Sequence, residues 1–147
     1  MSPLYFEDLP TGDIHIPATY ELSEDEIIAF AQRWDPQPFH VDPLYAAQSP
    51  MKGLFASSAH TYSIAALLFN QMEPAVAGIG SLKQEMELPN PARPGDILSL
   101  QVCCVDKRPS TSKPDRALVT LESTLVNQHG IVILRLRSLM MIKRRPN

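Results

Sequence analysis

The chain has 147 residues, of which 44% are hydrophobic and 20% are charged, and its formal net charge at pH 7 is −3. This length suits one domain with a single core, and the composition is typical of a folded globular protein rather than a disordered chain. The only basic run, residues 143–145, is too small to supply the concentrated basic face that nucleic acids require, so we expect no nucleic acid partner.

Nothing in the sequence indicates secretion or a membrane anchor. The first residues lack the basic start and apolar run of a signal peptide, and no apolar stretch is long enough to cross a bilayer. Cys103 and Cys104 are adjacent and would point to opposite faces of a strand, which fits neither a disulfide framework nor a paired metal site. We therefore expect a cytoplasmic protein with reduced cysteines and no membrane partner.

The N-terminal part of the chain predicts a short strand and a well-marked helix. Residues 14–17 alternate in polarity, and the proline at their end should break this strand or place it at a sheet edge. Ser23 and Glu26 have the spacing of a capping box, which starts a helix. Two prolines should end it and leave a stiff loop over residues 35–40. The apolar residues on one face of this helix are Ile27, Phe30, Ala31 and Trp34.

The rest of the chain predicts further helix and then a run of strands. Residues 42–47 are typical of a short helix, and residues 54–70 are small or apolar nearly all round, which predicts a long helix buried on most sides. Turns are expected at residues 89–95 and 127–130, and a loop rich in Pro and Ser at residues 107–115. The alternating segments predicted as strands are residues 82–88, 97–105, 117–126 and 131–142.

Helices followed by hairpin-linked strands are typical of an α+β fold in which one helix packs on one face of an antiparallel sheet. We interpret the order as a hot-dog fold: residues 1–147 form a single domain, whose sheet wraps around a central helix at residues 54–70. Such a protomer leaves a sheet edge and apolar surface open. We therefore expect a homodimer or a higher homo-oligomer.

The loop that follows the first predicted helix carries the residues best suited to acid–base chemistry. Adding water across a double bond conjugated to a thioester needs a base for the water, an acid for the α-carbon and donors for the enolate-like oxygen. Asp35 and His40 could do the first two tasks, and the prolines between them restrict the loop. Their spacing alone equally fits a carboxylate bonded to nearby backbone and a half-buried histidine.

A wider pattern resembles one family, the MaoC-like dehydratases, which include the (R)-specific enoyl-CoA hydratases. Residues 5–9, 53–58 and 91–96 resemble the usual opening of these proteins, the start of their central helix and a turn between their strands. The resemblance therefore covers nearly the whole chain and implies the hot-dog fold. The residues that match the family's loop motif are Asp35, Pro38, His40, Asp42 and Pro43.

This resemblance implies a hydro-lyase of fatty acid metabolism that hydrates 2-enoyl thioesters or dehydrates 3-hydroxyacyl thioesters, with acyl-CoA as the substrate. Asp35 and His40 would hold and activate water, and the backbone N–H of Ser58 would face the thioester carbonyl, a role that suits a helix N-terminus. No metal or other cofactor would be needed, because the substrate itself carries coenzyme A. The further residues expected to contact substrate are Trp34, Gln37, Phe39 and Ser57.

Three positions depart from the family pattern, which usually has Gly at the positions of Trp34 and Ser58 and Asn at that of Gln37. Added side chains there would narrow the pocket and change the choice of substrate. A non-catalytic acyl-thioester-binding subunit is therefore an alternative, and an acyl-CoA thioesterase is another, because the same fold supports it with a carboxylate and a helix N-terminus. A metal site that includes Asp42 and a serine nucleophile at Ser57 or Ser58 are weaker hypotheses, since neither has the spacing that such sites use.

Overall fold

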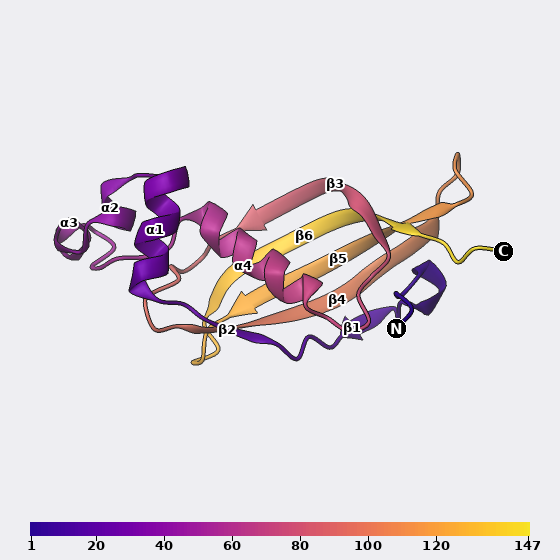
Figure 1. Ribbon diagram of the computed structural model, residues 1–147, viewed down its shortest axis with the longest axis horizontal. Helices are drawn as coiled ribbons and strands as arrows, with labels where there is room; N and C mark the ends of the chain where they lie inside the picture. Colours follow the sequence, from indigo (N-terminus) through magenta and orange to yellow (C-terminus); the bar gives the residue numbers. More distant parts are fainter.

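The structure, a computed structural model that describes residues 1–147, contains a six-stranded antiparallel sheet crossed by one helix (Figure 1). The strands follow the order β1–β4–β5–β6–β3, and β2 also pairs with β4. The strand bounds are β1 Gly12–Ile14, β2 Thr19–Glu21, β3 Gly78–Glu87, β4 Ile97–Pro109, β5 Arg116–Val126 and β6 Val132–Lys143.

The helices divide into one that covers the sheet and a group that stands at its end. Helix α4 crosses one face of the sheet, whereas α1, α2 and α3 gather beyond one end of the strands, and both termini lie at the opposite end (Figure 1). This arrangement confirms the predicted α+β class. No helix is long and apolar enough to cross a membrane. The bounds are η1 Phe6–Asp8, α1 Glu24–Trp34, α2 Pro38–Val41, α3 Pro43–Gln48 and α4 Ser58–Asn70.

The two faces of the sheet differ because successive side chains of a strand point to opposite sides. On the face toward α4, Leu100 and Leu121 join Ile64 and Leu68 of the helix in the main apolar cluster. Full burial of one such side chain stabilises the fold by roughly 1.5–3 kcal/mol. The opposite face carries paired charges, which include Arg137 with Glu122 and Arg135 with Glu87.

Strand β3 is an open edge of this sheet. It pairs only with β6, and all ten of its residues are exposed. Leu82 is 54% exposed and Met86 is 44% exposed. A long edge with unpaired backbone groups and apolar side chains is a surface on which another chain can pair.

The four strands predicted after the central helix are confirmed with small changes at their ends. The strand predicted at residues 14–17 is wrong in its bounds, because β1 ends at Ile14 and β2 begins only at Thr19, beyond Pro17. Both short strands pair with β4. Strand β4 continues to Pro109, where the predicted loop at residues 107–115 was expected, because Pro109 still lies opposite Ala117 of β5. The loop is therefore shorter than the composition suggests.

The predicted hairpin turn between β5 and β6 is confirmed. The Asn127 side-chain oxygen accepts the backbone N–H groups of His129 at 2.9 Å and Ile131 at 3.0 Å. Gly130 has a φ of 72°, which a glycine adopts without steric cost. Side-chain capping and a permissive residue together close the turn.

Two helix boundaries differ from the sequence prediction. The central helix begins at Ser58 rather than at residue 54, because Ser57 is its N-cap and accepts the backbone N–H of His60. The predicted loop over residues 35–40 contains the short helix α2, with Pro38 at its first position. Proline is favoured there because its missing N–H would have no partner in the helix anyway.

The expected burial of the central helix is also corrected, and the end of α1 is open to solvent. Trp34 is 64% exposed, because α1 ends beyond the strands, where the sheet no longer covers it (Figure 1). Helix α4 buries one face rather than most of its sides, and Leu67 and Ser63 on the other side are exposed. This outward side of α4 is free of contacts with the sheet.

Candidate active site

Asp35 and His40 come together at the end of the molecule formed by α1, α2 and α3. Asp35 follows the last residue of α1, and its backbone N–H donates to the Ala31 carbonyl oxygen at 2.8 Å, which fixes the position of the side chain. His40 lies in α2 and is buried. Asp35 Oδ2 is 3.5 Å from His40 Nε2, longer than an ordinary hydrogen bond. Both atoms are therefore available to a third group.

The imidazole of His40 is fixed by contacts with the chain that leads into α4. Its Nδ1 lies 2.7 Å from the carbonyl oxygen of Phe55. A carbonyl oxygen only accepts, so Nδ1 carries a proton and Nε2 of the neutral ring is left as the acceptor on the Asp35 side. The rings of Phe39 and Phe55 pack edge-on against the imidazole, with centroids 4.6 and 4.7 Å away.

Gln37 holds the carboxylate from its other side. Its Nε2 donates to Asp35 Oδ1 at 2.8 Å. Since Oδ1 is used in this contact, Oδ2 is the oxygen that faces His40. The carboxylate and the imidazole thus each have one atom bound to the protein and one atom free for chemistry.

The N-terminus of α4 provides free donors beside this pair. The Ser57 hydroxyl accepts the His60 N–H, whereas the N–H groups of Ser58 and Ala59 have no acceptor within the chain. Unpaired N–H groups at a helix N-terminus favour a negatively charged oxygen, and the helix dipole adds to the effect. The residue predicted to serve as an oxyanion donor, Ser58, is thus placed with a free amide.

A single cavity of about 210 Å³ joins these groups. Asp35, His40, Gln37 and Ser58 all line it, so the structure brings four of the predicted site residues together. Its remaining wall comes from the segment before α4, from the first turn of α4 and from the turn between β3 and β4. These other lining residues are Met51, Phe55, Ala56, Thr61, Leu88, Pro89, Asn90, Pro91 and Ala92.

Three of the predicted substrate contacts do not line the cavity. Trp34 is exposed and has the Arg33 guanidinium 4.8 Å from its ring centroid. Phe39 stacks on Phe55 with centroids 5.4 Å apart. Ser57 is fully buried, and its hydroxyl caps α4. A role for these three side chains in substrate binding stays a prediction.

Asp42, which belongs to the matched loop motif, has a structural contact instead of a place in the cavity. Its Oδ1 accepts the backbone N–H groups of Leu44 at 3.0 Å and Tyr45 at 3.2 Å, and so caps α3. No group of three His, Cys, Asp or Glu side chains is arranged to hold a metal ion.

The sequence prediction missed Arg93, which fixes the segment that precedes α4. Its guanidinium donates to the carbonyl oxygens of Gly53 at 2.8 Å, Leu54 at 3.3 Å and Met51. The planar guanidinium can serve several carbonyl groups at once because its N–H donors are fixed in a fork. Arg93 thereby ties the turn between β3 and β4 to residues 51–54.

This contact reaches His40 through the next residue along the chain. Phe55, whose carbonyl oxygen holds the His40 ring, directly follows the segment that Arg93 binds. Arg93 is itself fixed by its backbone N–H, which donates to Asp96 Oδ2 at 2.9 Å. The only sequence signal for Arg93 was its place in the turn at residues 91–96.

With this geometry established, comparison with known proteins identifies the family. The model of the family described as "MaoC like domain" matches residues 6–127 of this chain. The chain belongs to this family. Its structure superposes on the MaoC-like dehydratase from Rhodospirillum rubrum with a TM-score of 0.88 and 38% identity, over 98% of this chain and 99% of that one. The resemblance stated from the loop motif and flanking segments is therefore confirmed.

One further solved structure supports the fold, and two sequence relatives differ in what is known of them. A Mycobacterium tuberculosis protein described as having a double hot-dog fold superposes on 99% of this chain, over 46% of its own length, with a TM-score of 0.78 and 19% identity. The Bacillus subtilis protein YdeM, described as uncharacterized, is 26% identical over 94% of this chain and 98% of its own length. The 3-hydroxybutyryl-CoA dehydratase of Methylorubrum extorquens is 28% identical over 67% of this chain and 62% of its own length.

Proposed function

We propose that this protein is a hydro-lyase that adds water to 2-enoyl-CoA thioesters or removes it from 3-hydroxyacyl-CoA thioesters. The observation that carries the proposal is the convergence of Asp35 Oδ2, His40 Nε2 and the free N–H of Ser58 on one cavity. A base for the water, an acid that protonates the α-carbon and a donor for the carbonyl oxygen are the groups that this reaction needs. Kinship with a 3-hydroxybutyryl-CoA dehydratase supports the same substrate class.

In the proposed hydration, a water molecule lies between Asp35 Oδ2 and His40 Nε2. It gives one proton to this pair while its oxygen bonds to C3 of the enoyl group. The electrons of the C2–C3 double bond shift toward the thioester carbonyl, whose oxygen receives the Ser58 N–H. The proton then passes from the pair to C2, and dehydration follows the same steps in reverse. Every atom of the water ends on the product.

We propose that no cofactor takes part, since this reaction transfers no electrons to an acceptor and coenzyme A arrives with the substrate. The proposed working form is a homodimer that pairs along the exposed edge strand β3. The proposed compartment is the cytoplasm, because Cys103 and Cys104 are both free and reducing compartments keep thiols in this form.

A panel of 2-enoyl-CoA substrates of several chain lengths tests the function. Hydration is followed as loss of the conjugated enoyl absorbance, and free thiol is measured in the same samples. We expect hydration without thiol release. Thiol release without hydration would instead support the thioesterase alternative, and tight acyl-CoA binding without turnover would support the binding subunit.

A further inference from the structure

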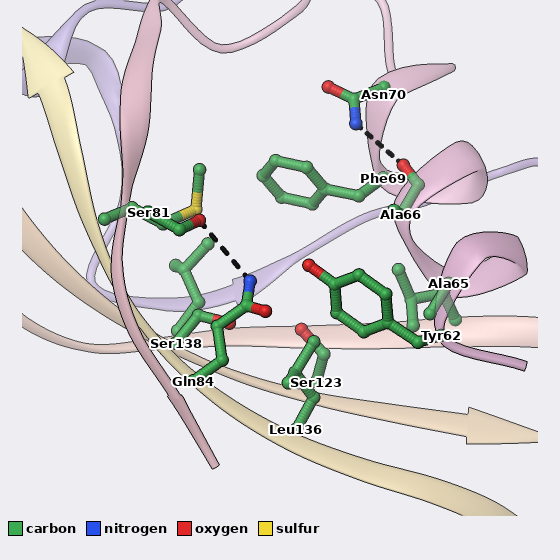
Figure 2. Close-up of a pocket in the computed structure, with 13 residues that line it drawn as sticks. Tyr62, Ala65, Ala66, Phe69, Asn70, Ser81, Gln84, Ser123, Leu136 and Ser138 are labelled. Carbon is green, nitrogen blue, oxygen red and sulfur yellow. Dashed lines mark hydrogen bonds between the residues drawn. The ribbon is translucent and has the colours of Figure 1, made fainter. Parts of the chain in front are cut away.

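Helix α4 directs two nearby aromatic rings to different sides. Tyr62 lines a cavity of about 100 Å³ between α4 and the sheet, together with Ser123 and Ser138 (Figure 2). His60, two positions earlier, lies on nearly the opposite side of the helix, because an α-helix has 3.6 residues per turn. Its ring stacks on Phe30 of α1, with centroids 4.5 Å apart and an angle of 8° between the ring planes. The two helices thus meet at an aromatic contact.

His60 carries the one buried side-chain polar atom that has no hydrogen-bond partner within the chain, its Nδ1. The residue is 5% exposed. Buried polar atoms are nearly always paired, so an exception calls for a physical reason. A phenylalanine at this position would make the same stack on Phe30 and would leave no polar atom unpaired. Packing therefore does not explain the imidazole, and the property that it adds is protonation near neutral pH.

The protonated ring does not suit this place. An imidazolium has an N–H on both nitrogens, so Nδ1 would point a donor at a site without an acceptor, and the charge would lose its hydration. Burial accordingly lowers the pKa of His60. The elements packed on α4 here are α1, β2 and β4. Glu26 of α1 is the one charged group that acts on the ring, and it is bound by the Tyr20 hydroxyl of β2.

The stack lies between the two parts of the candidate active site. Asp35 follows Phe30 by five residues at the end of α1, and Ser58 precedes His60 by two residues at the start of α4. At 1.5 Å per residue, these positions are about 7.5 Å and about 3 Å along their helices from the contact. α1 stands beyond the end of the strands, where it packs against α2 and α4 (Figure 1). A change in the stack therefore moves the acid–base pair relative to the oxyanion donor.

We propose that His60 is a positioning residue whose neutral ring holds α1 against the first turn of α4, and that protonation of this ring loosens the contact and switches the site off at acid pH. The closed form binds a proton less readily than an open form with its ring in water, so acid favours the open form. A misplacement of about 1 Å between Asp35 and the Ser58 N–H can lower the rate by about 100-fold. The catalytic part of this proposal rests on the hydratase function proposed above, whereas the structural part is independent of it.

Amide hydrogen exchange tests the contact without reference to activity. An opening that releases one buried histidine takes up one proton. With the ordinary pKa of about 6.5 in the open form, the open population should rise about tenfold between about pH 7.5 and 5.5. After correction for intrinsic rates, α1 amides of the wild type should lose protection by this factor at the lower pH, within a time in which β5 stays protected.

His60→Phe keeps the ring and cannot be protonated, so its α1 protection should be the same at both pH values. Unchanged protection of α1 in the wild type, or an equal loss in this variant, would overturn the proposal.

The kinetics of enoyl-CoA hydration test the positioning role. His60→Ala removes the ring and should lower kcat by about 100-fold at neutral pH with little change in KM, since the contacts with substrate remain. His60→Phe should recover most of this kcat. In the wild type both His40 and His60 must be neutral, but in His60→Phe only His40, so the wild-type rate should fall more steeply toward acid pH. Parallel acid limbs, or a low kcat of His60→Phe at neutral pH, would overturn the proposal.

His129→Phe is the matched control, because His129 is an exposed histidine in the turn between β5 and β6. It should change neither the protection of α1 nor the pH profile, and a profile flattened as in His60→Phe would contradict a role specific to His60. Where His60→Ala fails to fold, the comparison of the wild type with His60→Phe carries the test. If no enoyl-CoA is hydrated, the proposed reaction is wrong, and the exchange experiment alone decides on the contact.

Discussion

His40 Nδ1 lies 2.7 Å from the carbonyl oxygen of Phe55, a residue that is fifteen positions away in the sequence. This contact leaves Nε2 as the free nitrogen of the ring and directs it toward Asp35 Oδ2 at 3.5 Å. The main chain thus decides which nitrogen can act as a base.

The variants Asp35→Asn and His40→Gln should each lower kcat/KM for enoyl-CoA hydration by about 100-fold or more, the usual range for general acid–base residues. If both groups act on one water, the double variant should be little worse than either single variant. Steady-state kinetics give the three values, and acyl-CoA affinity serves as the control, since it should change much less. Losses that multiply would indicate separate roles.

Replacement of Ser58 tests the backbone donor at the start of α4. Proline is tolerated at the first position of a helix, so Ser58→Pro should preserve α4 while removing one N–H. We expect it to lower kcat by about 100- to 1000-fold, as loss of one oxyanion donor does. Ser58→Gly keeps the N–H and should retain activity. Equal activity of the two variants would exclude this N–H from the mechanism, provided that circular dichroism shows the same helix content.

Arg93→Met should destabilise the fold by about 1–3 kcal/mol, because it leaves carbonyl groups of the segment before α4 without their charged donor. Arg93→Lys should recover only part of the loss, since one ammonium group cannot reproduce the fork. Urea unfolding measures both. Arg137→Met is the matched control on the outer sheet face, where loss of an exposed pair should cost less than about 1 kcal/mol. Equal costs at both arginines would contradict this role.

His60 should make stability depend on pH near neutrality. Burial against α1, where its ring stacks on Phe30 with centroids 4.5 Å apart, lowers the pKa of His60, and nearby Glu26 only partly opposes this effect. The unfolded chain then binds a proton more readily than the folded one, so stability falls as the pH drops below the ordinary histidine pKa of about 6.5.

The matched variant for this effect is His60→Phe, which retains an aromatic ring against Phe30 and cannot be protonated. The free energy of unfolding of the wild type should fall more steeply than that of the variant between about pH 7.5 and 5.5. Urea unfolding at several pH values gives both slopes. Parallel slopes would show that His60 does not couple protonation to folding.

The wild-type protein should sediment as a dimer or a multiple of it. Lysine residues on an edge strand oppose pairing, so Leu82→Lys/Met86→Lys should shift the protein toward the monomer. Leu44→Lys on α3 is a control at an exposed position away from β3 and should leave the dimer intact. A stable, active wild-type monomer would contradict the proposed pairing.

Local features of the sequence determined the elements of this protein. The spacing of Ser23 and Glu26 predicted the start of α1, and the alternation of apolar and polar residues predicted the strands, because both signals act between residues a few positions apart. The same reasoning extended the central helix too far, to residue 54, since apolar composition does not mark a cap. Helical spacing grouped Trp34 with the apolar residues on one face of α1, but it cannot tell that this end of the helix is exposed.

Only the tertiary structure decided which distant groups meet. Arg93 reaches Gly53 from forty positions away, and Ser123 and Ser138 face one cavity from two different strands. Strand β3 pairs with β6 rather than with β4, the next strand in the chain. These contacts depend on how the strands are ordered and how α4 crosses them, which is set by packing of the whole core. Local sequence patterns carry no information about that long-range order.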